Sequence, residues 1–316
     1  MGSMVALLLL RQGHKVRVMD CLMHGGTPLL GLWHEDGFEF VPGDLRSKGD
    51  VDDALDGVEA VVHLGAIVGD PACAAQPELA REINLASSLN LLESCRRLGV
   101  GRFVFASTCS NYGVMADGSG YVTEESELSP LSLYAETKVA VERVLLDTSA
   151  DGKPHATVLR FATLFGISPR MRFDLTVNEF TLELLTKKKL VVYGEQFWRP
   201  YVHVKDAARA VTLVLESHPD RVASKVFNVG DTNENYQKGQ LVSLICSQLG
   251  GDVEIEHVVK QEDPRDYRVS FEKIQRELGF RITRTVADGI REIIDAVKQG
   301  VIGDYDNPQY RNVGVS

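Results

Sequence analysis

The sequence predicts an α/β protein with a doubly wound parallel sheet and a smaller C-terminal α/β subdomain. Short Val- and Ile-rich runs alternate with amphipathic segments through the first half of the chain, which is typical of a parallel sheet covered by helices on both faces. After residue 166 this alternation changes and shorter elements follow. No linker or repeat divides the 316 residues, so we expect one compact body.

The expected elements follow the chain in order. Up to residue 166, the strands are apolar runs at 14–20, 38–44, 58–66, 101–108 and 155–166. The helices of this part have apolar residues at helical spacing, at 4–12, 77–98 and 133–147. Further on we expect helices at 177–187, 206–217, 238–249 and 271–278, and strands at 189–194, 201–204 and 225–230. The first subdomain is then 1–166 and the second is 167–316, with 201–229 returning to the first.

The composition argues against several classes of partner and site. A net charge of −10 is unfavourable for binding nucleic acid or an anionic membrane surface. The five cysteines are scattered without a C-x-x-C pair, which is typical of reduced thiols and predicts a cytoplasmic protein. The eight histidines form no group with metal-ligand spacing, so no metal site is expected. The apolar run at 4–10 is too short to span a bilayer, and no membrane association is expected.

A tyrosine and a lysine four residues apart, Tyr134 and Lys138, lie in the segment SLYAETKVAVE. The segment has helical periodicity, so the two side chains share one face of a helix. A lysine ammonium held there would lower the pKa of the phenol from about 10 toward neutrality and let it act as an acid or base. The alternative is two neighbours on a solvated face. Tyr201 and Lys205 have the same spacing, but Tyr201 lies in a strand-like run, so those side chains should not stack.

Ten segments, taken in their order and spacing, carry a resemblance to a known family. They are GSMVALLLLRQGHKVRVMD, VPGDLRS, VVHLGA, EINLASSLNLLES, FVFASTCSNYG, LYAETK, VLRFATLFG, RPYVHVKDAARA, FNVG and RELGF. Over essentially its whole length the chain resembles the extended short-chain dehydrogenase/reductase family, in its NAD-dependent nucleotide-sugar epimerase, dehydratase and reductase branch. The resemblance implies a Rossmann-like fold, with NAD bound by 1–166 and a nucleotide-diphosphate sugar bound by 167–316.

The resemblance also implies which positions contact NAD. They are Gly2, Asp20, Asp44, Leu45, Leu64, Gly65, Ala66, Asn84, Tyr134 and Lys138. Asp20 closes an expected strand, where a carboxylate accepts hydrogen bonds from the adenosine ribose and repels a 2′-phosphate, which favours NAD over NADP. The alternative for Asp20 is an aspartate that ends a strand in a turn.

The beginning of the chain departs from the family pattern. A dinucleotide-binding fold should begin with a buried strand and a glycine-rich turn, whereas this chain begins at the end of such a turn. The first strand and most of the glycine-rich loop are therefore expected to be missing, and Gly2 alone represents the phosphate-binding glycines. A late start, a cloning remnant or a true absence would explain this. The late start is favoured because Gly2, the helix and the strand at 14–20 continue the pattern in step.

The catalytic residues that the resemblance implies are Thr108, Tyr134 and Lys138. Oxidising a sugar carbinol requires a base that removes the hydroxyl proton while NAD accepts the hydride from the same carbon. Tyr134 would be that base, with its pKa lowered by Lys138, and Thr108 would donate or relay a hydrogen bond to the same oxygen. The alternative for Thr108 is a strand-end hydroxyl bonded to the backbone.

The substrate contacts implied in the same way are Thr108, Cys109, Ser110, Asn178, Arg199 and Arg265. Asn178 resembles an asparagine at the sugar-linked phosphate, and Arg199 an arginine at the diphosphate, where a planar guanidinium suits bidentate contact. Arg265 would replace a displaced family arginine. Arg170 and Arg172 could also reach the ligand, but each arginine could equally be a solvated surface charge.

The residues after Thr108 limit the types of reaction that the protein is expected to catalyse. In the related dehydratases an Asp-Glu pair follows the catalytic threonine, because dehydration needs an acid at the C6 hydroxyl and a base at the C5 proton. Here the two positions hold Cys109 and Ser110, so a dehydratase or decarboxylase is disfavoured, and Cys109 is interpreted as a buried structural thiol rather than an acid.

The main interpretation is a 4-epimerase with transient oxidation at sugar C4. The alternatives are a ketosugar reductase, a dehydrogenase of a small alcohol and a non-catalytic dinucleotide-binding protein. The resemblance further implies a homodimer formed through the helices at 77–98 and 133–147.

Overall fold

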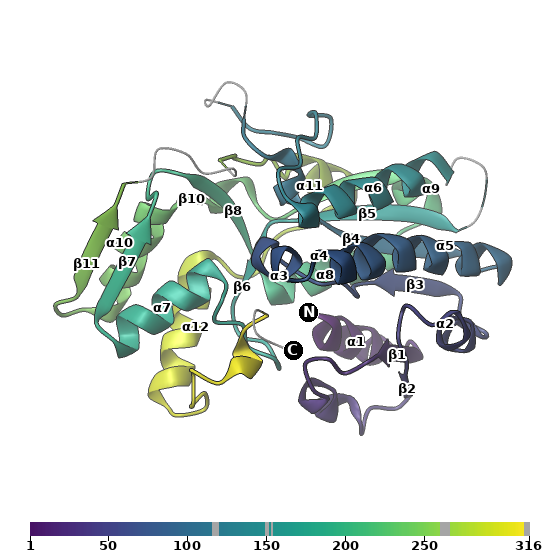
Figure 1. Ribbon diagram of the computed structural model, residues 1–316, viewed down its shortest axis with the longest axis horizontal. Helices are drawn as coiled ribbons and strands as arrows, with labels where there is room; N and C mark the ends of the chain where they lie inside the picture. The colour runs from purple at the N-terminus through teal and green to yellow at the C-terminus, as the bar shows by residue number, and fades with distance from the viewer. Residues whose placement is uncertain (116–119, 149–151, 153, 260–265, 313–316) are drawn as a thin grey trace.

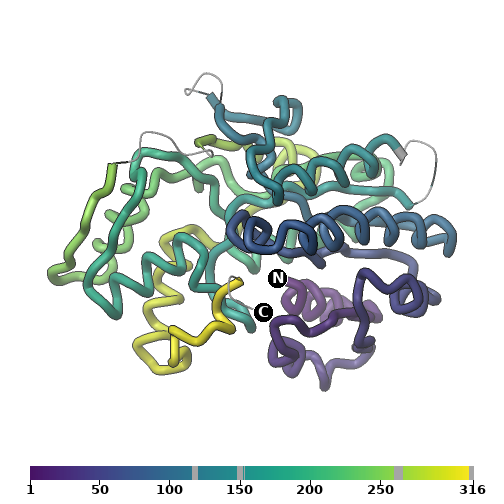
Figure 2. Tube along the Cα trace, viewed as in Figure 1, coloured from purple at the N-terminus to yellow at the C-terminus, as the bar shows by residue number. Residues whose placement is uncertain are grey.

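The computed structural model describes residues 1–115, 120–148, 152, 154–259 and 266–312. A larger part, coloured mainly purple to teal in Figure 1, surrounds a parallel sheet. A smaller green and yellow part contains α7 (Thr176–Thr186), β7 (Lys189–Tyr193), β11 (Glu254–Val258) and α12 (Val286–Lys298). The C-terminal segment returns to the middle of the molecule, near the start of the chain (Figure 2). There the Asn312 side-chain amide donates to the Val68 carbonyl at 3.3 Å, so this segment joins the two parts.

Four parallel strands form the central sheet, in the order β3-β4-β5-β9. Their bounds are Ala60–His63 for β3, Arg102–Thr108 for β4, His155–Phe161 for β5 and Lys225–Val229 for β9. The helices that cover the sheet are α1 (Gly2–Arg11), α5 (Ser88–Arg97), α6 (Leu133–Thr148) and α8 (Val204–Glu216).

Alternate residues of β4 pack on opposite faces, as the period of a strand requires. Phe103 and Phe105 join an apolar cluster with α5 and α6. Val104, between them, packs with α1 and α8 on the other face. Because both faces are covered in this way, β4 and β5 form the buried centre of the sheet, and their carboxyl ends are held in place by packing on each side.

A second parallel pair, β1 (Val16–Asp20) and β2 (Phe38–Pro42), forms a separate small sheet. In the described part of the chain, no strand pairs with β1 or β3 on the sides that border the cavity between them, which has a volume of about 1430 Å³. Parallel strands are usually buried on both faces, yet most residues of β1 and β3 are only partly buried. The expectation about a missing first strand stays a prediction.

The smaller part is built from two short sheets and three helices. In one sheet β8 lies between β6, which is parallel to it, and β10, which is antiparallel, and the other is the parallel pair β7 and β11. The strands are β6 (Thr163–Phe165), β7 (Lys189–Tyr193), β8 (Trp198–His203), β10 (Asn235–Gln237) and β11 (Glu254–Val258). The helices are α7 (Thr176–Thr186), α10 (Lys238–Leu249) and α12 (Val286–Lys298). One apolar cluster includes side chains of all three helices.

The structure confirms the predicted fold class and each predicted strand. Two predicted elements are divided, however. The predicted strand at 155–166 is β5 and β6 with a break at Ala162. The predicted helix at 77–98 consists of α4 (Pro77–Arg81), a π-helical segment η2 (Glu82–Ser87) and α5. The helix α12 is a further difference, because the sequence analysis predicted no element there.

The remaining elements are short. They are α2 (Lys48–Leu55), α3 (Asp70–Ala75), α9 (Pro219–Val222), α11 (Glu272–Leu278) and the 3-10 helices η1 (Thr27–Leu32), η3 (Cys109–Tyr112), η5 (Thr232–Glu234) and η6 (Pro308–Tyr310). Among the described residues no helix is both long and apolar enough to cross a membrane. No three His, Cys, Asp or Glu side chains gather as metal ligands in that part of the chain either.

Candidate active site

Tyr134 and Lys138 lie on one face of α6, which runs along β4 and β5. The Lys138 Nζ donates to the carbonyl oxygen of Ala106 in β4 at 2.8 Å and lies 4.7 Å from the centre of the Phe105 ring. It is 5.9 Å from the centre of the Tyr134 ring. Because Ala106 precedes Thr108 by two residues, this contact ties the face of α6 to the end of β4 that carries Thr108. Tyr201 and Lys205 lie in β8 and α8, with Tyr201 buried and Lys205 exposed, so they form no comparable pair.

The ionisation of the pair differs from the prediction. Burial raises the pKa of the Tyr134 phenol well above its usual value, and Cys73 and Asp70 raise it further. A buried phenolate loses its hydration, and this cost exceeds the effect of Arg172, the positive charge that lowers the pKa. The expected lowering toward neutrality is therefore wrong, because the pKa of Tyr134 is shifted upward. Burial also lowers the pKa of the Lys138 ammonium to about 8.

Thr108 ends β4 and caps the turn η3. Its Oγ1 accepts a hydrogen bond from the backbone N–H of Ser110 at 3.1 Å. The Cys109 thiol is buried and donates to the carbonyl of Arg160 at 3.3 Å, and burial raises the pKa of this thiol. Cys109 thus packs into the core on the β5 side, while Ser110 is only partly buried.

Ser110 is linked to Arg199 through a residue that the sequence analysis missed. The Tyr267 hydroxyl donates to Ser110 Oγ at 3.4 Å, and the Arg199 guanidinium lies 5.7 Å from the centre of the Tyr267 ring. Tyr267 follows Ser110 by 157 residues, so no local spacing could have predicted the contact. A signal was nonetheless present, because Tyr267 follows by two residues the predicted substrate contact Arg265. Arg265 itself lies outside the described residues.

Asn178 and Arg172 hold the loop that follows β6. The Asn178 amide accepts from the backbone N–H of Gly166 and donates to the Arg172 carbonyl, each at 2.9 Å. Both ends of the amide are therefore engaged with the protein backbone, and in this arrangement Asn178 orients the loop. Arg172 forms a two-pronged ion pair with Asp174 at 2.7 and 2.9 Å.

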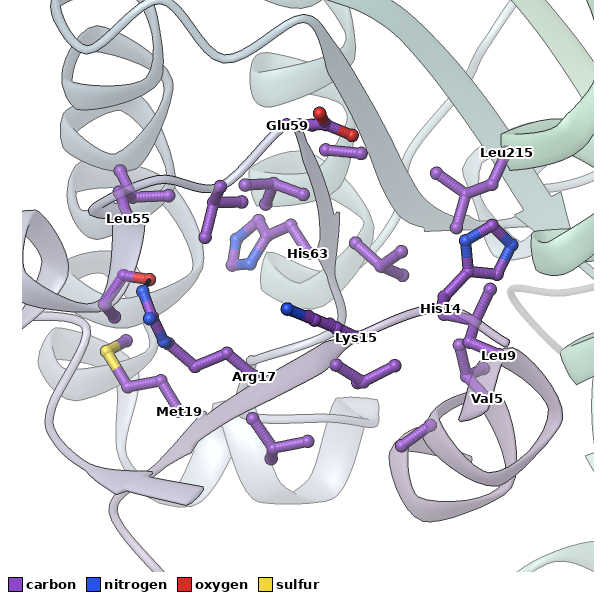
Figure 3. A pocket seen from close by; sticks show the side chains of 18 of the residues that line it. Val5, Leu9, His14, Lys15, Arg17, Met19, Leu55, Glu59, His63 and Leu215 are labelled. Atoms are coloured by element: carbon purple, nitrogen blue, oxygen red, sulfur yellow. Dashed lines mark hydrogen bonds between the residues drawn. The ribbon is translucent and has the colours of Figure 1, made fainter. Parts of the chain in front are cut away.

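Half of the predicted NAD contacts line the cavity between β1 and β3. They are Gly2, Asp20, Leu45, Leu64 and Gly65. Figure 3 shows how Arg17 and Met19 of β1, His63 of β3 and Val5 of α1 surround this cavity. The predicted contacts lie at the carboxyl ends of the strands and the beginning of α1, which is where α/β sheets bind nucleotides.

These residues have properties that fit NAD. Asp20 is exposed at the end of β1, and its Oδ1 accepts a hydrogen bond from the backbone N–H of Leu22 at 2.7 Å. The first turn of α1 contains no acidic residue, so the positive end of the helix dipole is not neutralised there. A Cβ on Gly65 would lie 2.5 Å from the tip of the Leu45 side chain, so that side chain would have to shift to admit one.

Asn84, Asp44 and Ala66, which are also predicted NAD contacts, do not line this cavity. Asn84 holds the loop after β3, since its amide accepts from the Ile67 N–H at 2.8 Å and donates to the Ile67 carbonyl at 2.9 Å. The Asp44 carboxylate pairs with Arg46 at 2.6 Å, and this hydrogen-bonded guanidinium lowers the pKa of the carboxyl group. Ala66 lies in the loop that Asn84 holds.

Comparisons with known proteins agree with this geometry. The sequence model of the NAD dependent epimerase/dehydratase family matches residues 1–230. A dTDP-glucose 4,6-dehydratase of Streptomyces niveus is 29% identical over 291 residues, which cover 90% of this chain and 83% of the relative. A UDP-glucose 4-epimerase of Corynebacterium glutamicum is 28% identical over 302 residues, 88% of this chain and 87% of the relative.

The fold is also similar to that of a solved structure. The crystal structure of the Thermus thermophilus UDP-glucose 4-epimerase in complex with NAD superposes with a TM-score of 0.81 at 27% identity, and the match covers 94% of this chain and 95% of that one. The family model matches well over half of the chain, on the residues that form the parallel sheet and the Tyr134 face. The chain therefore belongs to the NAD-dependent epimerase/dehydratase family, the extended short-chain dehydrogenase/reductases that act on nucleotide sugars with NAD as cofactor.

Proposed function

We propose that this protein is a nucleotide-sugar 4-epimerase in which Tyr134 is the acid and base. The observation that carries the proposal is the combination of the Tyr134 and Lys138 face of α6 with a turn after Thr108 that contains no carboxylate. Oxidation and reduction at one sugar carbon need the first feature, and dehydration needs carboxylates that the turn does not supply.

The bound cofactor supplies the hydride acceptor and donor in this chemistry. Tyr134 takes the proton of the C4 hydroxyl when the carbon is oxidised and returns a proton to the same oxygen when the carbon is reduced. Lys138, whose Nζ is fixed on the Ala106 carbonyl, provides positive charge beside the phenol. Burial raises the pKa of Tyr134, and the Arg172 charge lowers it. The positive charge of Lys138, whose Nζ lies 5.9 Å from the centre of the ring, likewise favours the phenolate that the first step requires.

Thr108 holds the C4 oxygen in this proposal. Its Oγ1 accepts from the Ser110 N–H, which leaves its own hydroxyl proton available to a substrate oxygen. The ketosugar then has to rotate and present its opposite face, so the site must hold the nucleotide more firmly than the sugar. Arg199 is the proposed contact for the diphosphate, and Ser110 and Tyr267 lie between it and Thr108.

The turn also supports epimerisation over dehydration. Loss of water across C5 and C6 requires one group that protonates the leaving hydroxyl and one that removes the C5 proton. Cys109 is buried against the Arg160 carbonyl with a raised pKa, and Ser110 is a neutral hydroxyl. Neither side chain suits these two tasks, although dehydratases are among the relatives of this chain.

The test is to incubate the purified protein with a catalytic amount of NAD and a panel of UDP- and dTDP-linked hexoses. The proposal predicts a product of unchanged mass whose C4 configuration is inverted in the proton NMR spectrum, without net formation of NADH. A product lighter by one water would indicate a dehydratase. Conversion only of a ketosugar, with one NADH consumed per turnover, would indicate a reductase, and either result would overturn the proposal.

A further inference from the structure

Glu142 continues the face of α6 that begins with Tyr134 and Lys138. The three residues are spaced by four, so their side chains lie above one another along the helix. Glu142 is 1% exposed, and a carboxylate is seldom buried so completely unless it is paired. Its place in the sequence alone indicates no role for it.

The Glu142 carboxylate is bound from three sides. It accepts hydrogen bonds from the Ser107 hydroxyl and, at 2.8 Å, from the Asn111 amide. Arg160 in β5 forms a two-pronged contact with it, at 2.7 Å from Nη2 and 3.1 Å from Nε. Ser107 immediately precedes Thr108, and Asn111 immediately follows Ser110. The carboxylate therefore holds both ends of the turn that carries the proposed substrate contacts.

The network continues behind this turn. Arg160 Nη1 donates to the Tyr112 hydroxyl at 3.0 Å, and that hydroxyl donates to the Asn228 side chain at 2.7 Å. The participating side chains come from β4, η3, β5, α6 and β9, and α6 lies along β5 in Figure 1. A shift of the carboxylate would thus be transmitted to Thr108 from two directions.

Glu142 also contributes to the charge around Lys138. The groups that face the Lys138 ammonium are His63 of β3, Cys73 of α3, and Tyr134 and Glu142 of α6. Burial lowers the pKa of Lys138, and Cys73 and, to a smaller extent, Glu142 oppose this lowering. Removing the Glu142 charge takes away one of the two opposing effects, so the pKa of Lys138 should fall further.

We propose that Glu142 is a positioning residue of the active site, which fixes the Thr108 turn against α6 and balances the charge of Lys138. The proposal rests on the proposed function for its catalytic part. Glu142 acts through Thr108 and Lys138 and does not itself contact the substrate.

The experiment compares Glu142→Gln with Glu136→Gln, which removes a charge of the same sign from an exposed position on the same helix. For Glu142→Gln we expect kcat to fall about 10- to 100-fold with little change in KM. A loosely held catalytic group slows the chemical step but leaves the contacts that bind the substrate in place. The alkaline limb of the kcat profile should move to lower pH. Glu136→Gln should behave like the wild-type protein.

Direct titration of Lys138 provides a readout that does not depend on turnover. In protein labelled with ¹³C at lysine Cε, the Lys138 resonance is assigned with Lys138→Met and followed against pH. The negative charge of Glu142 raises the pKa of Lys138, so we expect the midpoint in Glu142→Gln to be lower than in the wild-type protein. An unchanged midpoint together with unchanged kcat would overturn the proposal.

A purely structural role is separated by a double variant. Glu142→Gln alone leaves the buried Arg160 guanidinium without the carboxylate that neutralises it and can impair folding, whereas Glu142→Gln with Arg160→Met removes both charges. We expect the double variant to fold and its kcat to stay about 10- to 100-fold below that of the wild-type protein, because the Thr108 turn still lacks the carboxylate that holds it. If the double variant folds and regains the wild-type kcat, Glu142 serves stability only. If the wild-type protein converts no nucleotide sugar, the proposed function fails, and the titration still decides the charge balance.

Discussion

At the scale of single residues, Tyr134 shows what the sequence could and could not predict. Its spacing from Lys138 and the helical period predicted the shared face, and the structure has both residues on α6. The direction of its pKa shift could not be predicted, because it depends on burial beneath segments that are distant in sequence. Asp70 and Cys73, which raise this pKa, lie in α3, an element that the sequence did not predict.

Replacing Tyr134 with phenylalanine removes one hydroxyl and leaves the ring in place. We expect Tyr134→Phe to lower kcat by about 10²- to 10⁴-fold, the usual contribution of a general acid or base, while the affinity for NAD stays nearly the same. Steady-state kinetics and a fluorescence titration with NADH measure the two effects. Tyr193→Phe is the matched control, because Tyr193 is 54% exposed in β7. Comparable turnover in Tyr134→Phe would show that another group is the base.

His63 makes a prediction about acid stability. It is buried, its Nε2 lies 2.8 Å from the Ser88 Oγ, and burial together with the charge of Lys138 lowers its pKa to about 3. Between about pH 6.5 and pH 3, the unfolded chain binds a proton at this residue that the folded protein does not bind. Stability therefore falls as the pH falls through this window.

From pH 7.5 to pH 5 this one group should lower the free energy of unfolding by about 2 kcal/mol. Urea unfolding at the two pH values measures the loss. In His63→Gln the loss should be smaller by that amount, whereas His34→Gln, at an exposed position, should lose as much as the wild-type protein. An equal loss in His63→Gln would contradict the assignment to His63.

At the scale of elements, prediction succeeded where the signal is local. The strand β4 follows from its β-branched and aromatic run, and α8 from its apolar period. The π-helical segment Glu82–Ser87 could not be predicted, because it places Asn84 against the loop after β3 through contacts with Ile67. The helix α12 could have been predicted from the sequence, because Val286, Ile290 and Ile293 recur at helical spacing after Thr285, which begins a capping box.

The packing of α12 can be tested at Gly289. A Cβ on Gly289 would lie 2.5 Å from the ring of Phe165, which is itself 1% exposed and has no room to move. Gly289→Ala should therefore lower the free energy of unfolding by about 1 to 3 kcal/mol, even though alanine favours helices over glycine by about 1 kcal/mol.

Gly239→Ala in α10 is the matched control for this change. There the nearest atoms to an added Cβ are those of Glu195, at 3.5 Å and beyond, which is ordinary contact. Denaturant unfolding should show Gly239→Ala to be at least as stable as the wild-type protein. A Gly289→Ala variant of equal or greater stability would mean that the α12 packing is looser than described.

At the scale of the whole molecule, the order of motifs along the chain predicted the family and the parallel sheet, and both are confirmed. The pairing of the smaller sheets was not predictable, because β6, β8 and β10 meet across long stretches of sequence. Tyr267 was likewise absent from the predicted site, because it meets Ser110 across a long stretch of sequence. The homodimer, the cytoplasmic location and the division at residue 166 stay predictions.

A UDP- or dTDP-hexose that carries deuterium at C4 distinguishes epimerisation from dehydration. If the protein is a 4-epimerase, the deuterium leaves C4 and returns to the same carbon, so that NMR finds it at C4 of the inverted sugar with no net NADH. The Tyr134→Phe protein should leave the label and the configuration unchanged. Deuterium that appears at C6 of a product lighter by one water would contradict the proposed epimerase, because the hydride would then have been returned to a different carbon.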